Sequence, residues 1–299
     1  MTDTITEAPA DEAVQKTKAS GSARLMQGFG WAFIWLGLLS VGFVFHQVYI
    51  TSWIASAEQA ELAVEVQVYF EETAEVQSVL VDETGTPIFD VETGQPIEVD
   101  PLVVAPVGSV EPNASGGTGD PGDPAAPQPA RGEFPMLIES NPDRGTAFGN
   151  LRIPSLDSLK DGWNVVEGVK FRQLRKGAGH MPWTPLPGQI GNSVISGHRT
   201  TNGAPFRDLD QLEPGDRIEV ETAIGVHVYE VRKVQIVKPT ALWVTATDGP
   251  KRAGLEGGGE GSWLTLTTCH PKLSARQRLI VFAQLVDGPN FGTIDRLTG

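Results

Sequence analysis

Charged residues are missing from one long stretch of this 299-residue sequence. Residues 28–54 contain no Asp, Glu, Lys or Arg, and most of their side chains are apolar. At about 1.5 Å per helical residue, the stretch is long enough to cross a hydrocarbon core of about 30 Å. Lys16, Lys18 and Arg24 precede it and acidic residues follow it, so we expect a single-pass membrane anchor with a cytoplasmic N-terminus. A cleaved signal peptide is the alternative.

Basic residues are missing from the next stretch. Residues 55–130 contain 15 Asp or Glu and no Lys or Arg, whereas residues 131–299 contain 18 acidic and 20 basic residues. The formal net charge of −14 therefore arises in one segment, which we interpret as a solvated spacer. The C-terminal region is close to neutral. This argues against nucleic acid as a partner, because phosphate binding needs clustered positive charge.

Cysteine is nearly absent, since Cys269 is the only one. It follows the predicted anchor on the exported side, where cysteines are normally paired in disulfides. An unpaired cysteine there indicates a reactive thiol or an intermolecular bridge, and the alternative is a buried, inert thiol. One cysteine and scattered histidines lack the ligand spacing of a metal site, so we expect no metal and no cofactor.

Long helical patterns are missing from residues 134–288. This region instead has many short runs of β-branched residues between turn residues, among them NLRIPSL, NSVISGH, DRIEVET, HVYEVRKVQIV, WLTLTTC and RLIVFAQLV. Such spacing predicts a closed β-barrel or a sandwich. Residues 174–192 and 239–262 are irregular, with a short helical turn expected at 241–247. Both irregular stretches flank the candidate chemistry described below.

Composition divides the chain into five predicted segments. They are a disordered cytoplasmic tail (1–25), a transmembrane anchor (26–54), an acidic stalk (55–104), a Pro/Gly-rich linker (105–132) and a β-rich domain (133–290). Pro/Gly-rich chain is extended and flexible, so we expect the stalk and the linker to hold the β-rich domain off the membrane with some reach.

Nucleophilic chemistry at Cys269 would require a proton partner, because the thiolate is the reactive form and a free thiol has a pKa near ~8.5. His198 ends a strand-like run, as Cys269 does, and is the first candidate; His180 lies in a predicted loop and is the second. His227 lies in an alternating strand and is expected to face solvent. His270 directly follows the cysteine, so its side chain points to the opposite face.

An acyl-transfer reaction also needs a donor for the oxyanion. Arg276 and Arg278 both follow Cys269 and are two residues apart, so pattern alone leaves the choice between them open. A guanidinium suits this role because it stays charged and presents a rigid fork of donors. Thr268, next to the thiol, is a candidate for a hydrogen bond to substrate.

These motifs resemble those of a known family. Residues 265–269 read TLTTC and are followed by Arg278 nine residues after the cysteine, which is similar to the sortase signature. Residues 197–201 read GHRTT and resemble the sortase histidine segment. The stretches LRKGAGHMPWTPLPGQIGN and CHPKLSARQRLIVFAQL are most similar to class E sortases of high-GC Gram-positive bacteria. The resemblance covers roughly residues 147–288.

The resemblance implies an all-β fold, an eight-stranded closed barrel, with His198, Cys269 and Arg278 as the catalytic set. It further implies a membrane-anchored, extracellular cysteine transpeptidase that cleaves surface proteins at a C-terminal LPxTG- or LAxTG-type sorting signal, between Thr and Gly. The Thr carboxyl is then joined to an amine of a peptidoglycan precursor. Met181 stands where this class has an aromatic residue. A pilin-polymerising sortase that uses a lysine acceptor, and a secreted cysteine hydrolase, are the alternatives.

Overall fold

The computed structural model describes residues 21–46, 50–82, 85–91, 93–99 and 134–298. The chain divides into two compact units, Met1–Gln47 and Val48–Gly299. The described part of the first unit is essentially one helix, α1 (Gly21–Phe45). Within it, the 18 residues Gly28–Phe45 are apolar and long enough to cross a membrane, by length and composition. All other elements belong to the second unit.

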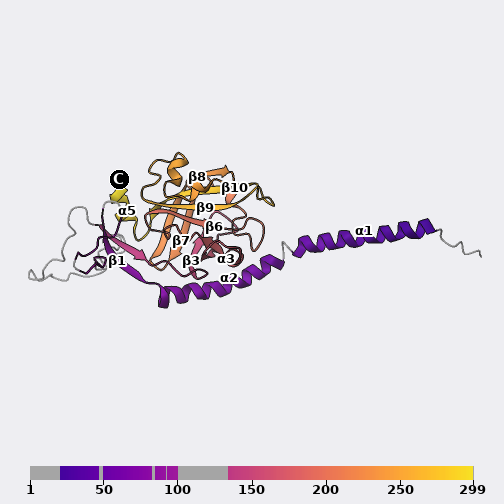
Figure 1. Cartoon of the computed structure of the whole chain (residues 1–299), viewed down its shortest axis with the longest axis horizontal. Coiled ribbons are helices and arrows are strands. Elements are labelled where there is room, and N and C mark those ends of the chain that lie inside the picture. Colours follow the sequence, from indigo (N-terminus) through magenta and orange to yellow (C-terminus); the bar gives the residue numbers. More distant parts are fainter. Residues whose placement is uncertain (1–20, 47–49, 83–84, 92, 100–133, 299) are drawn as a thin grey trace, which may run out of the picture. The chain divides into compact units, whose positions relative to one another are not determined.

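Eight strands of the second unit form a closed barrel, visible in Figure 1. They are β3 (Ala147–Arg152), β4 (Trp163–Glu167), β5 (Ala178–His180), β6 (Gly191–Ser196), β7 (Arg217–Thr222), β8 (Gly225–Val237), β9 (Ser262–His270) and β10 (Gln277–Asp287). Their order around the barrel is β10-β8-β7-β3-β4-β5-β6-β9, and β9 pairs with β10 to close it. The pairs β4–β5 and β6–β9 are parallel, and the others are antiparallel.

Apolar side chains of alternating strand positions fill the barrel. Ile218 and Val220 on β7 are fully buried, while their neighbours along the strand are more exposed, as expected when one face of a strand meets a core. The same core takes side chains from β3, β6, β9 and β10, including Leu151, Ile195, Leu266 and Val281. The closed eight-stranded barrel predicted from the sequence is confirmed.

Short helices lie in the connections between the strands and, in one case, after the last strand. They are α3 (Phe171–Lys176), the 3-10 turns η4 (Leu209–Gln211) and η5 (Leu242–Thr245), α4 (Gly249–Arg252) and α5 (Phe291–Thr298). The helical turn expected at 241–247 is present as η5. The stretch 174–192, expected to be irregular, instead contains the end of α3, strand β5 and the start of β6. Strand β5 has only three residues, too few for a periodic pattern to show.

Helix α2 (Thr51–Val68), in the second unit, packs against the barrel. Its Leu62 and Val66 form a small buried cluster with Ala147 of β3 and Val166 of β4. Polar contacts add to this: the Gln59 side chain accepts a hydrogen bond from the Asn164 backbone N–H (2.7 Å) and donates one to the Lys176 carbonyl oxygen (2.7 Å). The described part of the predicted stalk thus begins as a helix fastened to the domain.

A π-helical turn, η2 (Tyr69–Thr73), leads from α2 into strand β1 (Val76–Val81). Strand β1 pairs in antiparallel fashion with β2 (Phe134–Glu139), from Val76 opposite Glu139 to Val81 opposite Phe134. The predicted linker, residues 105–132, lies outside the described residues, and the predicted segment boundaries stay predictions. The described residues before and after it belong to one sheet: the Val99 N–H donates to the Ser78 carbonyl oxygen of β1, and Phe134 begins β2. The spacer role of the linker stays a prediction.

Candidate active site

Cys269 and Arg278 face each other on neighbouring strands. They are direct partners in the antiparallel ladder of β9 and β10. Side chains of direct partners leave the sheet on the same face, with β-carbons about 5 Å apart. Strand pairing therefore places the thiol and the guanidinium together, although nine residues separate them in the sequence.

His198 lies on the other side of the cysteine. The parallel ladder of β6 and β9 ends at Ser196 opposite Thr267. Beyond it, the Thr268 hydroxyl donates to the Gly197 carbonyl oxygen at 2.7 Å, which continues the alignment by one residue. The next residue is His198, in the loop just beyond β6, on one segment and Cys269, in β9, on the other. The three predicted catalytic residues thus form a row, with His198 after the end of β6, Cys269 in β9 and Arg278 in β10, and with the thiol in the middle.

The row lines a pocket of about 330 Å³. Its polar lining includes His198, Thr268, Cys269 and Arg278, and its remaining walls are largely apolar. The apolar residues are Val169, Leu174, Met181, Val237, Ala241, Leu242, Val244 and Ile280. An apolar hollow with a few convergent polar groups is the usual form of a ligand site. Thr268 lines this pocket, and its predicted hydrogen bond to substrate stays a prediction.

The electrostatics of His198 follow from its partial burial. Burial lowers the pKa of the His198 imidazole, because the charged form loses hydration. Its Nε2 is buried and has no hydrogen-bond partner among the described residues. A neutral imidazole without a fixed partner is able to accept a proton from a thiol or from an amine.

The two candidate arginines are separated by the structure. Arg278 is the second residue of β10 and lines the pocket, whereas Arg276 precedes the strand and does not. The Arg278 Nη1 donates to the carbonyl oxygens of Ala275 (3.0 Å) and Gln277 (2.9 Å). Because a guanidinium has five N–H groups, further donors remain for a substrate oxygen.

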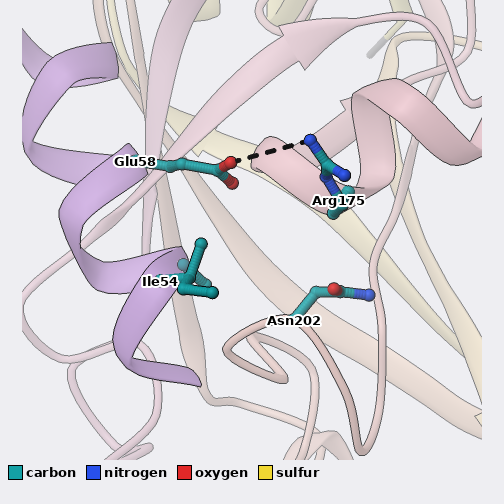
Figure 2. Close-up of a pocket in the computed structure, with 5 residues that line it drawn as sticks. Ile54, Glu58, Arg175 and Asn202 are labelled. Atoms are coloured by element: carbon teal, nitrogen blue, oxygen red, sulfur yellow. Dashed lines mark ion pairs between the residues drawn. The ribbon is translucent and has the colours of Figure 1, made fainter. Parts of the chain in front are cut away.

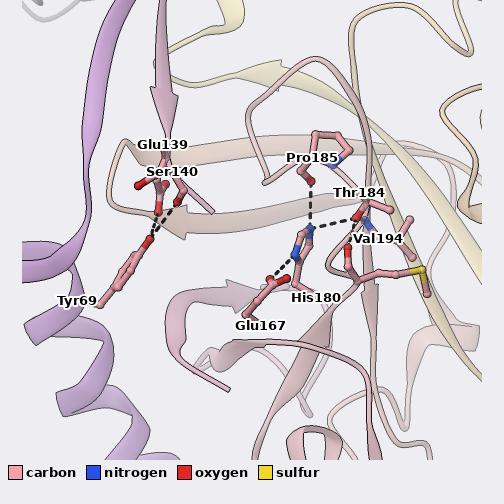
Figure 3. A network of polar contacts seen from close by, with 9 residues as sticks. Tyr69, Glu139, Ser140, Glu167, His180, Thr184, Pro185 and Val194 are labelled. Atoms are coloured by element: carbon pink, nitrogen blue, oxygen red, sulfur yellow. Dashed lines mark hydrogen bonds and ion pairs between the residues drawn. The ribbon is translucent and has the colours of Figure 1, made fainter. Parts of the chain in front are cut away.

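His180, the second candidate partner, is held elsewhere, in the network of Figure 3. Its side chain is buried, and its Nδ1 lies 2.6 Å from Glu167 Oε2. Its Nε2 lies 3.1 Å from both the Pro185 carbonyl oxygen and the Thr184 hydroxyl. His180 does not line the pocket. Its contacts instead fasten the start of the 181–190 connection, which carries Met181 into the pocket wall.

The prediction that His227 faces solvent is wrong. Its side chain is fully buried, and burial lowers the pKa of His227 to about 4. On β8 it is Val226 that is exposed, while His227 shares the inward face with Tyr229. The Thr222 hydroxyl lies 3.2 Å from His227 Nε2, whereas the buried Nδ1 has no hydrogen-bond partner among the described residues. An alternating pattern gives the period but not which face is inside.

The loop after His198 is in contact with helix α2. Ala55 is buried, and a β-carbon added to Gly203 would lie 3.1 Å from the Ala55 β-carbon. Close by, Ile54 and Glu58 of α2, Arg175 of α3 and Asn202 line a second pocket of about 230 Å³, shown in Figure 2. Glu58 and Arg175 form a long ion pair of 3.9 Å across it.

The sequence did not predict two buried charged residues near the site. They are Arg199, next to His198, and Glu167, the partner of His180. Pattern offered one signal only, a charged residue directly after a strand-like run. Among the residues that the structure describes, no group of three or more His, Cys, Asp or Glu side chains is placed to hold a metal ion.

A closed barrel that presents a thiol between an imidazole and a guanidinium has the arrangement that thiol-based acyl transfer requires. Comparison with known proteins agrees with that class. The sequence model of the Sortase domain matches residues 151–286. Sortase SrtE1 of Streptomyces coelicolor is 34% identical over 150 residues, which are 48% of this chain and 41% of that protein.

Sortase D of Bacillus subtilis is 31% identical over 148 residues, 48% of this chain and 67% of that protein. Among solved structures, sortase E from Streptomyces avermitilis has 35% identity and a TM-score of 0.44, covering 49% of this chain and 91% of that one. The chain belongs to the sortase family, whose members are cysteine transpeptidases. It spans about two fifths of the length of SrtE1.

Proposed function

We propose that this protein is a membrane-anchored transpeptidase that acts on C-terminal sorting signals of LPxTG or LAxTG type. It cleaves the signal between Thr and Gly and joins the Thr carboxyl to an amine of a cell-wall precursor. The observation that carries the proposal is that His198, just beyond β6, lines one pocket together with Cys269 of β9 and Arg278 of β10. Membership of the sortase family supports the same reaction class.

The first half of the reaction forms a thioester. His198 takes the thiol proton, and the Cys269 sulfur attacks the carbonyl carbon of the substrate Thr. Arg278 stabilises the oxyanion, a role for which preorganised donors are worth about 10²–10³-fold in rate. The C–N bond to Gly then breaks, and His198 returns its proton to the departing amine.

The second half transfers the acyl group. A neutral amine of the acceptor attacks the thioester carbonyl, gives its proton to His198, and forms the new amide. The C–S bond breaks, and the sulfur leaves as the thiolate that began the cycle. No proton is gained or lost overall, so a single imidazole serves both halves. Its lowered pKa suits this double use, since the neutral ring is the form that accepts a proton at each turn.

Anchoring is supported by helix α1, which is apolar enough over Gly28–Phe45 to cross a bilayer. We propose a cytoplasmic N-terminus and an extracellular barrel, so that enzyme and substrate meet at the same membrane. Protease treatment of intact cells tests this topology: the barrel should be digested while a tag on residues 1–20 is protected. N-terminal sequencing of the mature protein distinguishes an anchor from a cleaved signal peptide.

The decisive test is a peptide assay with an added amine. The full chain in detergent is mixed with a fluorogenic sorting-signal peptide and triglycine, and products are identified by mass spectrometry. We expect a Thr–triglycine amide, with no product from Cys269→Ala. Free acid alone, in the presence of excess triglycine, would identify a cysteine hydrolase instead. A second assay with a lysine-containing pilin-type peptide as the sole amine tests polymerising activity.

A further inference from the structure

The residue after the predicted catalytic histidine carries a buried positive charge. The side chain of Arg199 is only 2% exposed, although the residue lies in a loop. A buried guanidinium is costly unless its N–H groups are paired and hydrogen-bonded. Its surroundings therefore reveal what holds it there, and those surroundings include the end of the strand that bears the thiol.

Four partners surround the Arg199 guanidinium. Nη2 lies 2.8 Å from the carboxylate of Asp210, in the 3-10 turn η4. Nη1 donates to the carbonyl oxygen of Cys269 at 3.3 Å and lies 2.9 Å from Nδ1 of His270. Nε donates to the Arg207 carbonyl oxygen at 3.3 Å. One side chain therefore joins the histidine loop, the turn η4 and the last two residues of β9.

The hydrogen bond from Arg199 to the Cys269 carbonyl oxygen lies just beyond the end of the β6–β9 ladder. The ladder of β6 and β9 ends at Ser196 and Thr267, and the hydroxyl of Thr268 reaches one residue further. At the level of the reacting groups, the Arg199 bond to the Cys269 carbonyl is the next link between the two segments. Arg199 is covalently bonded to the residue that carries the imidazole. Its guanidinium is hydrogen-bonded to the residue that carries the sulfur.

We propose that Arg199 is the positioning residue that fixes His198 relative to Cys269. The inference rests on the proposed transpeptidase function and adds a residue to which no role was assigned above. Arg199 does not line the pocket, so it contacts no substrate there. Its charge is matched by Asp210, so it acts through geometry and not as a second oxyanion donor. A planar fork is needed to reach acceptors on three sides, which a lysine cannot do.

Asp210 links the Arg199 guanidinium to the loop that follows the thiol. The same carboxylate oxygen that binds Arg199 lies 3.9 Å from Lys272 Nζ, and Asp208 lies 3.5 Å from that Nζ. Lys272 is three residues after Cys269, in the loop between β9 and β10. The acidic pair around η4 therefore holds both the arginine beside the imidazole and the segment that follows the thiol.

The test compares variants of the full chain in detergent. Arg199→Lys keeps the charge and loses the fork. A displacement of about 1 Å between reacting groups costs roughly 10²-fold in rate, so we expect kcat of transpeptidation to fall about 30- to 100-fold, with KM changed less than about twofold. Arg152→Lys is the matched control, because Arg152 forms an ion pair with Glu219 on β3 and β7, remote from this pocket in the barrel order; its kcat should stay normal.

A double-mutant cycle separates positioning from general destabilisation. If Arg199 acts by placing His198 against the thiol, adding Arg199→Lys to His198→Ala should cause no further loss of kcat. Alkylation of Cys269 by iodoacetamide supplies a second readout, because it is the only thiol in the chain. The pH profile of alkylation in Arg199→Lys should move toward that of His198→Ala.

Three outcomes would overturn the inference. They are a normal kcat in folded Arg199→Lys, a loss that adds fully to that of His198→Ala, or an unchanged alkylation profile. Should Arg199→Lys fail to fold, Asp210→Asn decides: we expect kcat to fall at least about threefold at constant KM, and no change overturns the inference. Activity in Cys269→Ala would instead refute the proposed function, whatever Arg199 does.

Discussion

Ala55 of helix α2 and Gly203 of the histidine loop are in contact, so the helix that follows the membrane-spanning candidate touches a loop of the proposed active site. Gly203 has a φ of +75°, and a β-carbon there would also lie 2.4 Å from the Trp163 ring. We expect Gly203→Ala to lower the free energy of unfolding by about 2–4 kcal/mol, through the left-handed backbone and the crowding together. Chemical denaturation measures this.

Gly215 supplies the matched control for that experiment. Its φ is +101°, but a β-carbon there meets nothing within 4 Å. Gly215→Ala should therefore cost only the backbone term, about 1 kcal/mol, and leave kcat normal. If the two variants are equally stable, the crowding of Gly203 against Trp163 and Ala55 has no energetic importance.

Replacement of Arg278 by lysine should impair catalysis. The charge is retained, but a single ammonium cannot present two parallel donors to the oxyanion, so kcat/KM should fall about 10²-fold. Arg276→Lys is the natural comparison, since Arg276 is two residues away, exposed, and outside the pocket. Its kcat/KM should remain within about twofold of the original. If Arg276→Lys loses activity and Arg278→Lys does not, the oxyanion donor is Arg276 and the assignment to Arg278 is wrong.

The buried imidazole of His227 makes stability depend on pH. Its pKa is about 4 in the folded protein and near ~6.5 in the unfolded chain, so between these values the unfolded chain binds the extra proton. Stability should therefore fall as pH drops from about 6.5 to about 4, by up to about 3 kcal/mol from this group. Denaturant titrations across this range measure the slope.

His227→Gln removes that titration. Whatever the absolute stability of the variant, its free energy of unfolding should vary less steeply with pH between about 6.5 and 4 than that of the original protein. Identical slopes for the two proteins would mean that another group is responsible.

Gln59 should be a strong point of attachment for helix α2. Gln59→Ala removes its side-chain bonds and leaves the Asn164 N–H and the Lys176 carbonyl without them. An unsatisfied buried polar group costs about 1–3 kcal/mol, so we expect a loss of that size. Gln67→Ala, at an exposed position of the same helix, should change stability by less than about 0.5 kcal/mol. Equal effects would contradict a specific attachment.

Much of the barrel was predictable from the sequence, because its longer strands are β-branched runs between turn residues. Strand β5 was not, since three residues carry no period. The docking of α2 was not predictable either: Leu62 and Val66 are ordinary apolar residues in an acidic segment, and their partners Ala147 and Val166 lie about 80 or more positions away. The acidic residues of this helix predicted a solvated segment, and composition gave no sign that Leu62 and Val66 are buried against the barrel.

For the site, sequence patterns proposed Cys269 and His198 and left Arg276 and Arg278 undecided, because residues two apart in a strand look equivalent. The resemblance to the sortase family singled out Arg278, and the structure adds that Arg278 lies in β10 and lines the pocket. The position of Arg199 depends on a partner far along the chain, the Cys269 carbonyl, 70 positions away. Hydrogen bonds to backbone carbonyls leave no trace in residue type, so such roles are visible only in three dimensions.

The pairing of β1 with β2 has a practical consequence. The Val99 N–H donates to the Ser78 carbonyl oxygen of β1, and β2 begins at Phe134 opposite Val81, so the described chain breaks off and resumes at the same sheet. Foreign sequence placed between residues 105 and 131, such as an epitope or a fluorescent protein, would therefore start and finish beside the sheet of β1 and β2. The native segment would be equally free to lengthen or shorten from one relative to the next, with the pairing of β1 and β2 unchanged.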